Sequence, residues 1–152
     1  MSSFKGSFLH TVDSKGRINI SSKLRKNISN EAKNIFVLTR GFESCLFLYP
    51  QDEWEKLEES IRALSTTNPQ HRFMMRTMLE CAIEVELDGQ SRIMLTKELL
   101  QFAKIEHDVK LIGVLDKIEI WNPKIYDQYK SEQKESYEEV ASTIYLTTKT
   151  NN

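Results

Sequence analysis

The sequence is poor in several residue types that mark specialised classes of protein. Its 152 residues include only two cysteines, three histidines and three prolines. Cys45 and Cys81 lie within apolar runs and lack both the paired spacing of a zinc site and the density of a disulfide scaffold. We therefore expect buried free thiols. The apolar runs are only strand-sized and no basic segment precedes one at the N-terminus, which predicts a cytoplasmic protein without a signal peptide or a membrane span.

Signals of enzyme chemistry are also missing from the sequence. His10, His71 and His107 are scattered, and no serine or cysteine stands in the setting of a nucleophile. No glycine-rich phosphate loop follows an expected strand, and no histidine and carboxylate residues have the spacing of metal ligands. We expect neither an enzyme nor a site for a cofactor, a metal ion or a small-molecule substrate.

Charge is nearly balanced overall but unevenly distributed along the chain. The formal net charge is −1, yet residues 1–40 contain eight basic and two acidic residues, a net charge of +6 that leaves −7 for the remainder. A basic cluster around a surface turn is typical of phosphate binding. The alternative is a solvated basic face without a partner, and charge alone does not decide between them.

One nine-residue pattern occurs twice, first as VDSKGRINI and again, 75 residues later, as LDGQSRIML. Each copy contains Asp-x-x-x-Arg, formed by Asp13 and Arg17 and by Asp88 and Arg92. This spacing would also suit one face of a helix. The flanking residues instead alternate between apolar and polar, which is typical of strands with one solvated face. Each motif is therefore predicted to be a tight turn between two antiparallel strands.

The order of expected elements repeats with the motif and predicts a mixed α+β fold. The first half is expected to contain strands 4–12, 17–20, 34–39 and 45–49 with a short helix at 23–28, and the second half strands 82–87, 92–95, 108–114 and 118–121 with a helix at 97–103. Two such small halves cannot each bury a sizeable core. We expect them to exchange or interleave strands within one pseudo-symmetric body.

Helices are expected after each half. Apolar periodicity predicts helices over residues 51–64 and 69–79, and one from 124 to about 140. The expected organisation is a first half at 1–50, a helical linker at 51–80, a second half at 81–123, a C-terminal helix at 124–146 and a frayed tail at 147–152. Apolar side chains on these helices either contact other subunits or simply cover the sheet.

In this combination of features the chain resembles the MraZ family of bacterial regulators. The resemblance covers nearly the whole chain and rests on several strings, namely LHTVDSKGRINI from Leu9, RGFE from Arg40, YP ahead of Trp54, NP at Asn68 and IEIW from Ile118. It implies two tandem swapped-hairpin β-barrel halves like the DNA-binding domains of AbrB and MazE. It also implies a ring-shaped, nucleoid-associated homo-oligomer that binds promoter repeats of the division and cell-wall gene cluster, its own operon, and acts as a repressor of transcription.

The resemblance assigns DNA binding to Asp13, Arg17, Asp88 and Arg92, with Lys15 as a neighbour in the first turn. An arginine on a rigid turn can clamp a phosphate or contact a guanine edge with two hydrogen bonds. We expect each aspartate to order its loop and orient its arginine, because a carboxylate facing phosphates is repelled. The alternative is that both pairs are ion pairs within the fold.

The sequence departs from the family pattern in the second turn. The glycine usual before the second arginine is Ser91, and the prolines usual after the second strand of each half are Ser21 and Thr96. We expect Gly89 to supply the missing flexibility. The acidic strand before this turn is a poor neighbour for phosphate. A protein-interaction scaffold or antitoxin-like module without DNA binding remains the alternative function.

Overall fold

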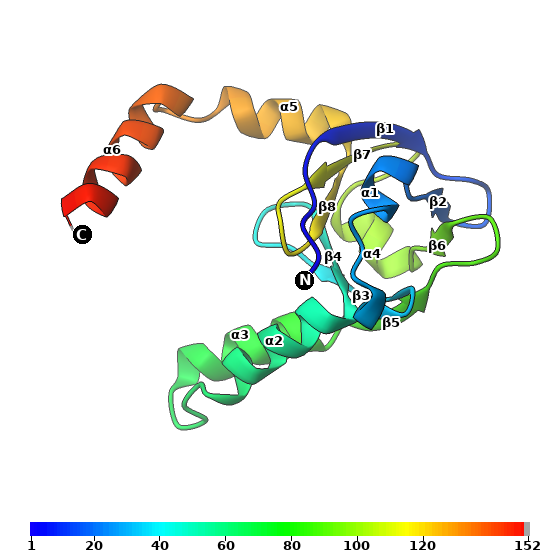
Figure 1. The fold of residues 1–152 in the computed structure, drawn as a ribbon, viewed down its shortest axis with the longest axis horizontal. Helices are drawn as coiled ribbons and strands as arrows, with labels where there is room; N and C mark the ends of the chain where they lie inside the picture. Colours follow the sequence, from blue (N-terminus) through cyan, green and yellow to red (C-terminus); the bar gives the residue numbers. More distant parts are fainter. Residues whose placement is uncertain (151–152) are drawn as a thin grey trace.

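The computed structural model describes residues 1–150, which form eight strands and six α-helices (Figure 1). The strands are β1 (Ser7–Thr11), β2 (Arg17–Asn19), β3 (Ile35–Arg40), β4 (Leu46–Pro50), β5 (Ile83–Glu86), β6 (Arg92–Met94), β7 (Asp108–Gly113) and β8 (Ile118–Trp121). The helices are α1 (Ser22–Arg25), α2 (Gln51–Arg62), α3 (Pro69–Leu79), α4 (Lys97–Phe102), α5 (Pro123–Ser131) and α6 (Tyr137–Thr150), and a 3-10 turn covers Asn30–Ala32. The predicted mixed α+β class is confirmed.

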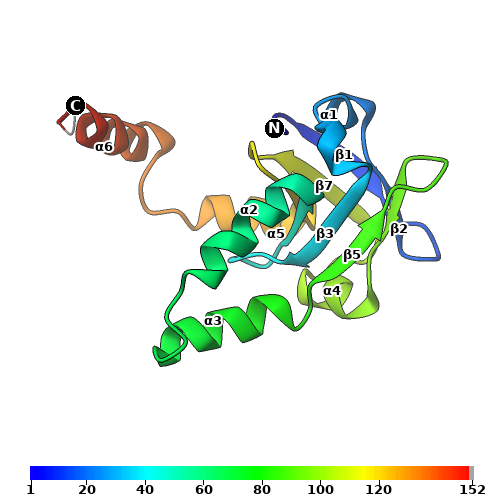
Figure 2. The ribbon, with the colours of Figure 1, turned by 60° about the horizontal axis from the view of Figure 1, so that its bottom comes forward.

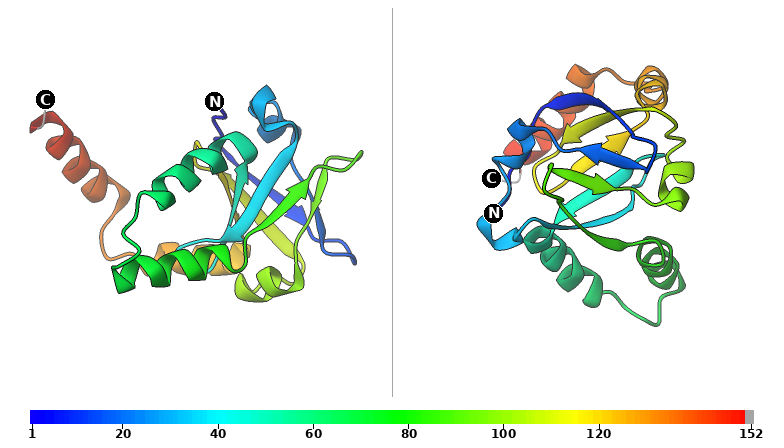
Figure 3. Two further views of the ribbon diagram at one scale, coloured as in Figure 1. Left: turned by 90° about the horizontal axis from the view of Figure 1, so that it is seen from below. Right: turned by 90° about the vertical axis from the view of Figure 1, so that its right-hand side faces the viewer.

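The strands form two antiparallel sheets. The larger one has six strands in the order β1-β7-β8-β4-β3-β5, and the smaller one pairs β2 with β6. Viewed from the side, both sheets surround a common interior (Figure 3, right). The order of the larger sheet reflects the duplication. β1, β7 and β8 on one side of its centre correspond in sequence to β5, β3 and β4 at the same distances on the other side.

The two halves interleave their strands. β1 of the first half pairs with β7 of the second, and β5 of the second half pairs with β3 of the first. The registers are equivalent, since Phe8 faces Leu111 in one pair and Ile83 faces Leu38 in the other. The two pairings are therefore related by the same pseudo-twofold relation as the two sequence copies.

One apolar core serves both halves. Its buried members include sequence-related pairs, namely Ile18 with Ile93, Leu24 with Leu99, Phe36 with Val109 and Leu38 with Leu111. Burying an aliphatic or aromatic side chain of this size contributes roughly 1.5–3 kcal/mol. Neither half retains this core without the other, which is the physical reason for the strand exchange.

The helices after the first half begin and end close to the predicted residues. Asn68 caps α3 by accepting hydrogen bonds from the backbone amides of Gln70 and His71, and Pro69 occupies the first helical position. The Thr39 hydroxyl donates to the Met78 carbonyl at 2.7 Å and fastens α3 to β3.

The C-terminal helical region differs from the prediction. A single helix from 124 to about 140 was expected, but α5 ends at Ser131 and α6 begins at Tyr137. The Ser136 hydroxyl accepts from the Glu139 amide at 3.1 Å. This Ser-x-x-Glu spacing is a helix-start signal, which a prediction from apolar periodicity alone does not take into account. The predicted tail from residue 147 is helical as far as Thr150, and residues 151–152 lie outside the described residues.

Within residues 1–150, no helix combines the length and apolar character needed to cross a bilayer.

Candidate nucleic-acid interface

The two Asp-x-x-x-Arg turns protrude side by side from one end of the body (Figures 1 and 2). The turns precede β2 and β6, which pair with Ile18 opposite Ile93. These two isoleucines occupy equivalent positions in the two sequence copies, so the pseudo-twofold axis passes between them. The helices α2, α3 and α6 lie toward the other end of the molecule (Figure 2).

The first turn is ordered by the carboxylate of Asp13. One oxygen, Oδ1, accepts from the backbone amides of Lys15 and Arg17, each at 2.9 Å. The other, Oδ2, accepts from Nε of Arg17 at 2.7 Å. Gly16 has a φ of 81°, and a β-carbon there would lie 3.1 Å from the Leu95 carbonyl oxygen. The motif therefore encodes both the loop conformation and the direction of its arginine.

The second turn repeats this geometry. Asp88 Oδ1 accepts from the amides of Gln90 and Arg92, and Oδ2 accepts from Nε of Arg92, all at 2.9 Å. Ser91 adopts the left-handed conformation itself, with a φ of 60°. The expectation that Gly89 would supply this flexibility is wrong, because Gly89 does not have a positive φ. Serine is strained in this region, but the surrounding hydrogen bonds hold it there.

Hydrogen bonds also join the two turns to each other. The Ile20 amide donates to the Ser91 carbonyl at 2.9 Å, and its symmetry equivalent, the Leu95 amide, donates to the Gly16 carbonyl at 2.8 Å. Asn19 Nδ2 donates to the backbone carbonyl of the residue before Ser91 at 3.1 Å. Sequence reasoning missed Asn19, because its only signal is a polar residue on a short strand. The turns form one rigid unit.

Both arginines reach solvent. The Arg17 and Arg92 side chains are 25% and 26% exposed, and each is held at Nε by its own aspartate. Arg92 Nη1 also lies 4.0 Å from Asp13 Oδ2. Within residues 1–150, neither terminal nitrogen of Arg17 donates a hydrogen bond. The Asp–Arg ion pairs within the fold, which were the alternative to DNA binding, are present. They engage Nε and leave both arginine side chains partly exposed.

Local hydrogen bonds keep both aspartates ionised. The Arg17 backbone amide lowers the pKa of Asp13 below its usual value, assisted by the guanidinium of the same residue. The Arg92 backbone amide acts on the pKa of Asp88 in the same way. Each turn therefore has a carboxylate that is ionised at neutral pH and orients an arginine, as expected from the motif.

The surroundings of the two turns differ in charge. Lys15 is exposed at the tip of the first turn, where the second turn has Gln90. The strand leading into the second turn carries the exposed Glu84 and Glu86, whereas β1 has no charged carboxylate. A polyanion would be attracted more strongly to the first turn.

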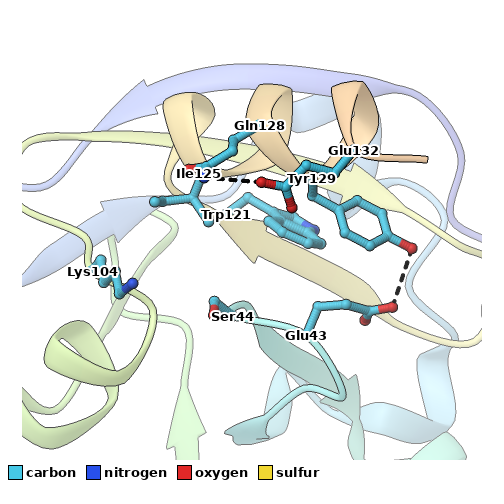
Figure 4. Close-up of a pocket in the computed structure, with 8 residues that line it drawn as sticks. All are labelled: Glu43, Ser44, Lys104, Trp121, Ile125, Gln128, Tyr129 and Glu132. Carbon is cyan, nitrogen blue, oxygen red and sulfur yellow. Dashed lines mark hydrogen bonds between the residues drawn. The ribbon is translucent and has the colours of Figure 1, made fainter. Parts of the chain in front are cut away.

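A separate hollow of about 270 Å³ lies between α5 and the β3–β4 turn (Figure 4). Tyr129 donates to Glu43 at 3.3 Å, and Gln128 donates to Glu132 at 3.1 Å. Tyr129 also packs against Trp121, with ring centroids 5.4 Å apart. The two Tyr129 contacts fasten α5 to the body of the molecule, whereas the Gln128–Glu132 hydrogen bond lies within the helix and its C-cap. The side chains in Figure 4 include no nucleophile paired with a base.

Both cysteines are free in the structure, but the predicted burial is confirmed for Cys45 alone, because Cys81 is half-buried. Burial, together with Glu119 and Glu43, raises the pKa of Cys45 to about 12, which makes it unreactive. In the described part of the chain, no three histidine, cysteine or acidic residues are arranged to hold a metal ion.

Comparisons with known proteins agree with this architecture. A family model described as "MraZ protein, putative antitoxin-like" matches residues 3–77 and again residues 78–147. The chain is 41% identical over 141 residues to the transcriptional regulator MraZ of Natranaerobius thermophilus, covering 93% of this chain and 96% of the relative. It is 40% identical over 139 residues to that of Caldanaerobacter subterraneus subsp. tengcongensis (91% and 94% covered), and 37% identical over 141 residues to that of Desulfitobacterium hafniense (93% and 96% covered). Two matches to one family model, in tandem along a duplicated sequence, establish that this chain belongs to the MraZ family.

Proposed function

We propose that this protein is a DNA-binding transcriptional regulator whose two Asp-x-x-x-Arg turns contact promoter DNA. The observation that carries this proposal is the paired geometry of the turns, which present two oriented, partly exposed guanidinium groups at one end of the body. The name of its relatives, transcriptional regulator MraZ, supports the same function.

The residues of the turns divide the work of binding. Arg17 and Arg92 contact base edges or phosphates with their terminal nitrogens, because Nε is engaged by the aspartates. Asp13 and Asp88 orient the arginines without touching DNA, and Lys15 adds a phosphate contact. A bidentate contact to a base edge gives about 1–3 kcal/mol of discrimination, so one protein copy supplies modest specificity.

The finer part of the proposal concerns assembly and targets. The interleaved strands support a description as two swapped-hairpin halves of the AbrB type within one chain. We further propose a cytoplasmic, nucleoid-associated ring of identical subunits. Such a ring engages repeated promoter sites through many weak contacts, and effective concentration multiplies their affinity. Its targets are the division and cell-wall gene cluster, including its own operon, which it represses.

The test is binding to the DNA upstream of the protein's own gene, measured by fluorescence anisotropy. We expect Arg17→Ala/Arg92→Ala to abolish specific binding, and the parent's affinity to fall steeply between about 50 and 200 mM salt, because bound phosphates release counterions. The matched control is Arg62→Ala, since Arg62 is 80% exposed on α2 and distant from the turns. It should bind DNA normally.

Two results would contradict the proposal. Unchanged DNA affinity in the double arginine variant would remove the turns from the interface. A flat salt dependence of the parent would remove phosphate contacts altogether and favour a protein-interaction scaffold. Circular dichroism of the double variant distinguishes the expected loss of binding from unfolding.

A further inference from the structure

The β2–β6 ribbon has an outward face that carries more than the two arginines. Ile18 and Ile93 at its centre are each 1% exposed and point into the core, so the residues on either side of them point outward. The outward residues are Arg17, Asn19, Arg92 and Met94. The ribbon lies at the end of the body from which both turns protrude (Figure 1). Asn19 and Met94 therefore share one face with the side chains that we assign to DNA.

Cross-strand pairing places each arginine beside a different neighbour. Met94 lies directly opposite Arg17, and Asn19 lies directly opposite Arg92. Directly opposed residues have β-carbons about 4.5–5.5 Å apart, so each arginine and its neighbour occupy one small area of the surface. Asn19 and Met94 are also equivalent positions of the duplication, 75 residues apart. The pseudo-twofold symmetry of the ribbon is thus broken by an amide in one copy and a thioether in the other.

The amide of Asn19 is exposed and already oriented. Its Nδ2 donates to the Gln90 backbone carbonyl at 3.1 Å, which fixes the plane of the amide. An asparagine amide has a second hydrogen on Nδ2 and an acceptor at Oδ1. Within residues 1–150, neither of these groups of Asn19 makes a hydrogen bond. A donor and an acceptor in this arrangement match N7 and N6 of adenine in the major groove, and the fixed plane reduces the entropy lost on binding.

Met94 offers a different chemistry on the same face. Its side chain is 53% exposed, apolar and without a hydrogen-bond donor. In the major groove the matching apolar group is the C5-methyl group of thymine. A flexible thioether adapts to this methyl group over a range of positions, so its selectivity is weaker than that of a fixed amide.

We propose that the outward face of the β2–β6 ribbon reads base edges in the major groove, with Asn19 selecting adenine and Met94 selecting thymine. The major groove of B-DNA is wide enough for a two-stranded ribbon, which supports this docking. Because the two contacts differ, one pseudo-symmetric chain recognises a non-palindromic site and binds it in a single direction. The inference rests on the proposed function and deepens it, since it names residues that determine which sequence is bound.

The first experiment scans the DNA upstream of the protein's own gene with single modified bases, using fluorescence anisotropy and the full chain. Each adenine in turn is replaced by 7-deazaadenine, which lacks N7, and each thymine by uracil, which lacks the methyl group. We expect the parent to lose about 2- to 10-fold in affinity at one adenine of a site, the value of one hydrogen bond. At one thymine we expect a loss of about 4-fold, the value of one buried methyl group.

The second experiment repeats the scan with two variants. Asn19→Ala should bind the adenine and 7-deazaadenine forms of the DNA equally well at the sensitive position, while it keeps the preference for thymine. Met94→Ser should no longer distinguish thymine from uracil, while it keeps the preference for adenine. Each result is a ratio of two affinities of the same variant. A partial loss of stability changes both affinities alike and leaves this ratio unaltered.

Two variants away from the ribbon are matched controls. Asn27→Ala removes an amide that is also held by a backbone carbonyl, because its Nδ2 donates to Lys23 at 3.2 Å. Leu115→Ser removes an apolar side chain that is 60% exposed on the turn between β7 and β8. Both controls should respond to the modified bases as the parent does.

The possible failures separate this inference from the proposed function. A parent that responds to no modified base would overturn the inference, as would an Asn19→Ala or Met94→Ser variant that keeps the full response of the parent. In both cases the turn–DNA proposal stands if Arg17→Ala/Arg92→Ala still abolishes binding. A parent that does not bind the upstream DNA would overturn the proposed function and this inference together.

Discussion

The two turns have nearly the same geometry but different residues at their tips. Both aspartates accept the same three hydrogen bonds, and both arginines are about one quarter exposed. The first turn has Lys15 and Gly16 where the second has Gln90 and Ser91. Backbone geometry is therefore maintained by the aspartate, while charge and conformational strain are free to differ between the copies.

The turns also differ in how their carboxylates are shared. Asp13 lies within 4.0 Å of the guanidinium groups of both Arg17 and Arg92, whereas, within residues 1–150, Asp88 forms an ion pair with Arg92 alone. Lys15 gives the first turn the more positive surroundings, and the Asp13 carboxylate of this turn lies near both arginines. We expect it to contribute more to DNA binding and to tolerate change less.

The largest difference is expected between the single arginine variants. Arg17→Ala should weaken binding to promoter DNA by about 1–3 kcal/mol. Arg92→Ala should weaken it by less, since Lys15 does not assist the second turn and the acidic Glu84 and Glu86 lie on its strand. Anisotropy titrations at one salt concentration measure both. A larger loss for Arg92→Ala would reverse the comparison.

The next effect concerns the glycine of the first turn. Gly16→Ala should destabilise the fold by roughly 1–2 kcal/mol, because alanine is disfavoured at a positive φ and its β-carbon would approach the Leu95 carbonyl. Denaturant unfolding measures the change. The control is Gly89→Ala in the second turn, where an added β-carbon meets no atom within 4 Å, and it should be far milder. Equal losses would show that the conformation of Gly16 is unimportant.

Acid should weaken both turns in a defined range of pH. The pKa values of Asp13 and Asp88 are lower in the folded chain than the ordinary 3.8, so their contribution to stability is present above that value. It is lost as pH falls through the lower folded pKa. Carboxyl carbon chemical shifts measured by NMR across this range report both values. Titration of either group at or above 3.8 would mean that its amide hydrogen bonds do not form in solution.

The smallest expected effect is a gain from Ser91→Gly. Serine at a φ of 60° carries a conformational cost that glycine avoids, offset in part by the greater freedom of glycine in the unfolded chain. We expect roughly 0.5–1 kcal/mol of added stability in denaturant unfolding, with unchanged DNA binding. A loss of stability would mean that the serine side chain makes a contribution of its own.

Much of the fold could be predicted from local patterns. Period-two alternation identified the strands around both motifs, and Asn68 with Pro69 identified the start of α3. The periodicity of Tyr126, Tyr129, Gln133 and Tyr137 predicts one C-terminal helix, but α5 ends at Ser131 and Ser136 caps the start of a separate helix, α6. Apolar periodicity continues across such a break and therefore does not detect it.

The second turn illustrates the limit of local reasoning more directly. The sequence predicts that Gly89 supplies the conformational freedom of this turn, yet Ser91 takes the left-handed conformation. The hydrogen bond from the Ile20 amide to the Ser91 carbonyl comes from the other half of the chain. Contacts of this kind override local conformational preference and leave no sign in the sequence around the turn.

The sequence by itself determined the duplication, the strand pattern and the Asp–Arg pairing within each turn, because those hydrogen bonds close within five residues. Only the tertiary structure decided that the two turns lie together and present both arginines at one end. That arrangement depends on the pairing of β2 with β6. The pairing joins residues 75 positions apart, and it forms because Ile18 and Ile93 are buried in a core that neither half can build alone.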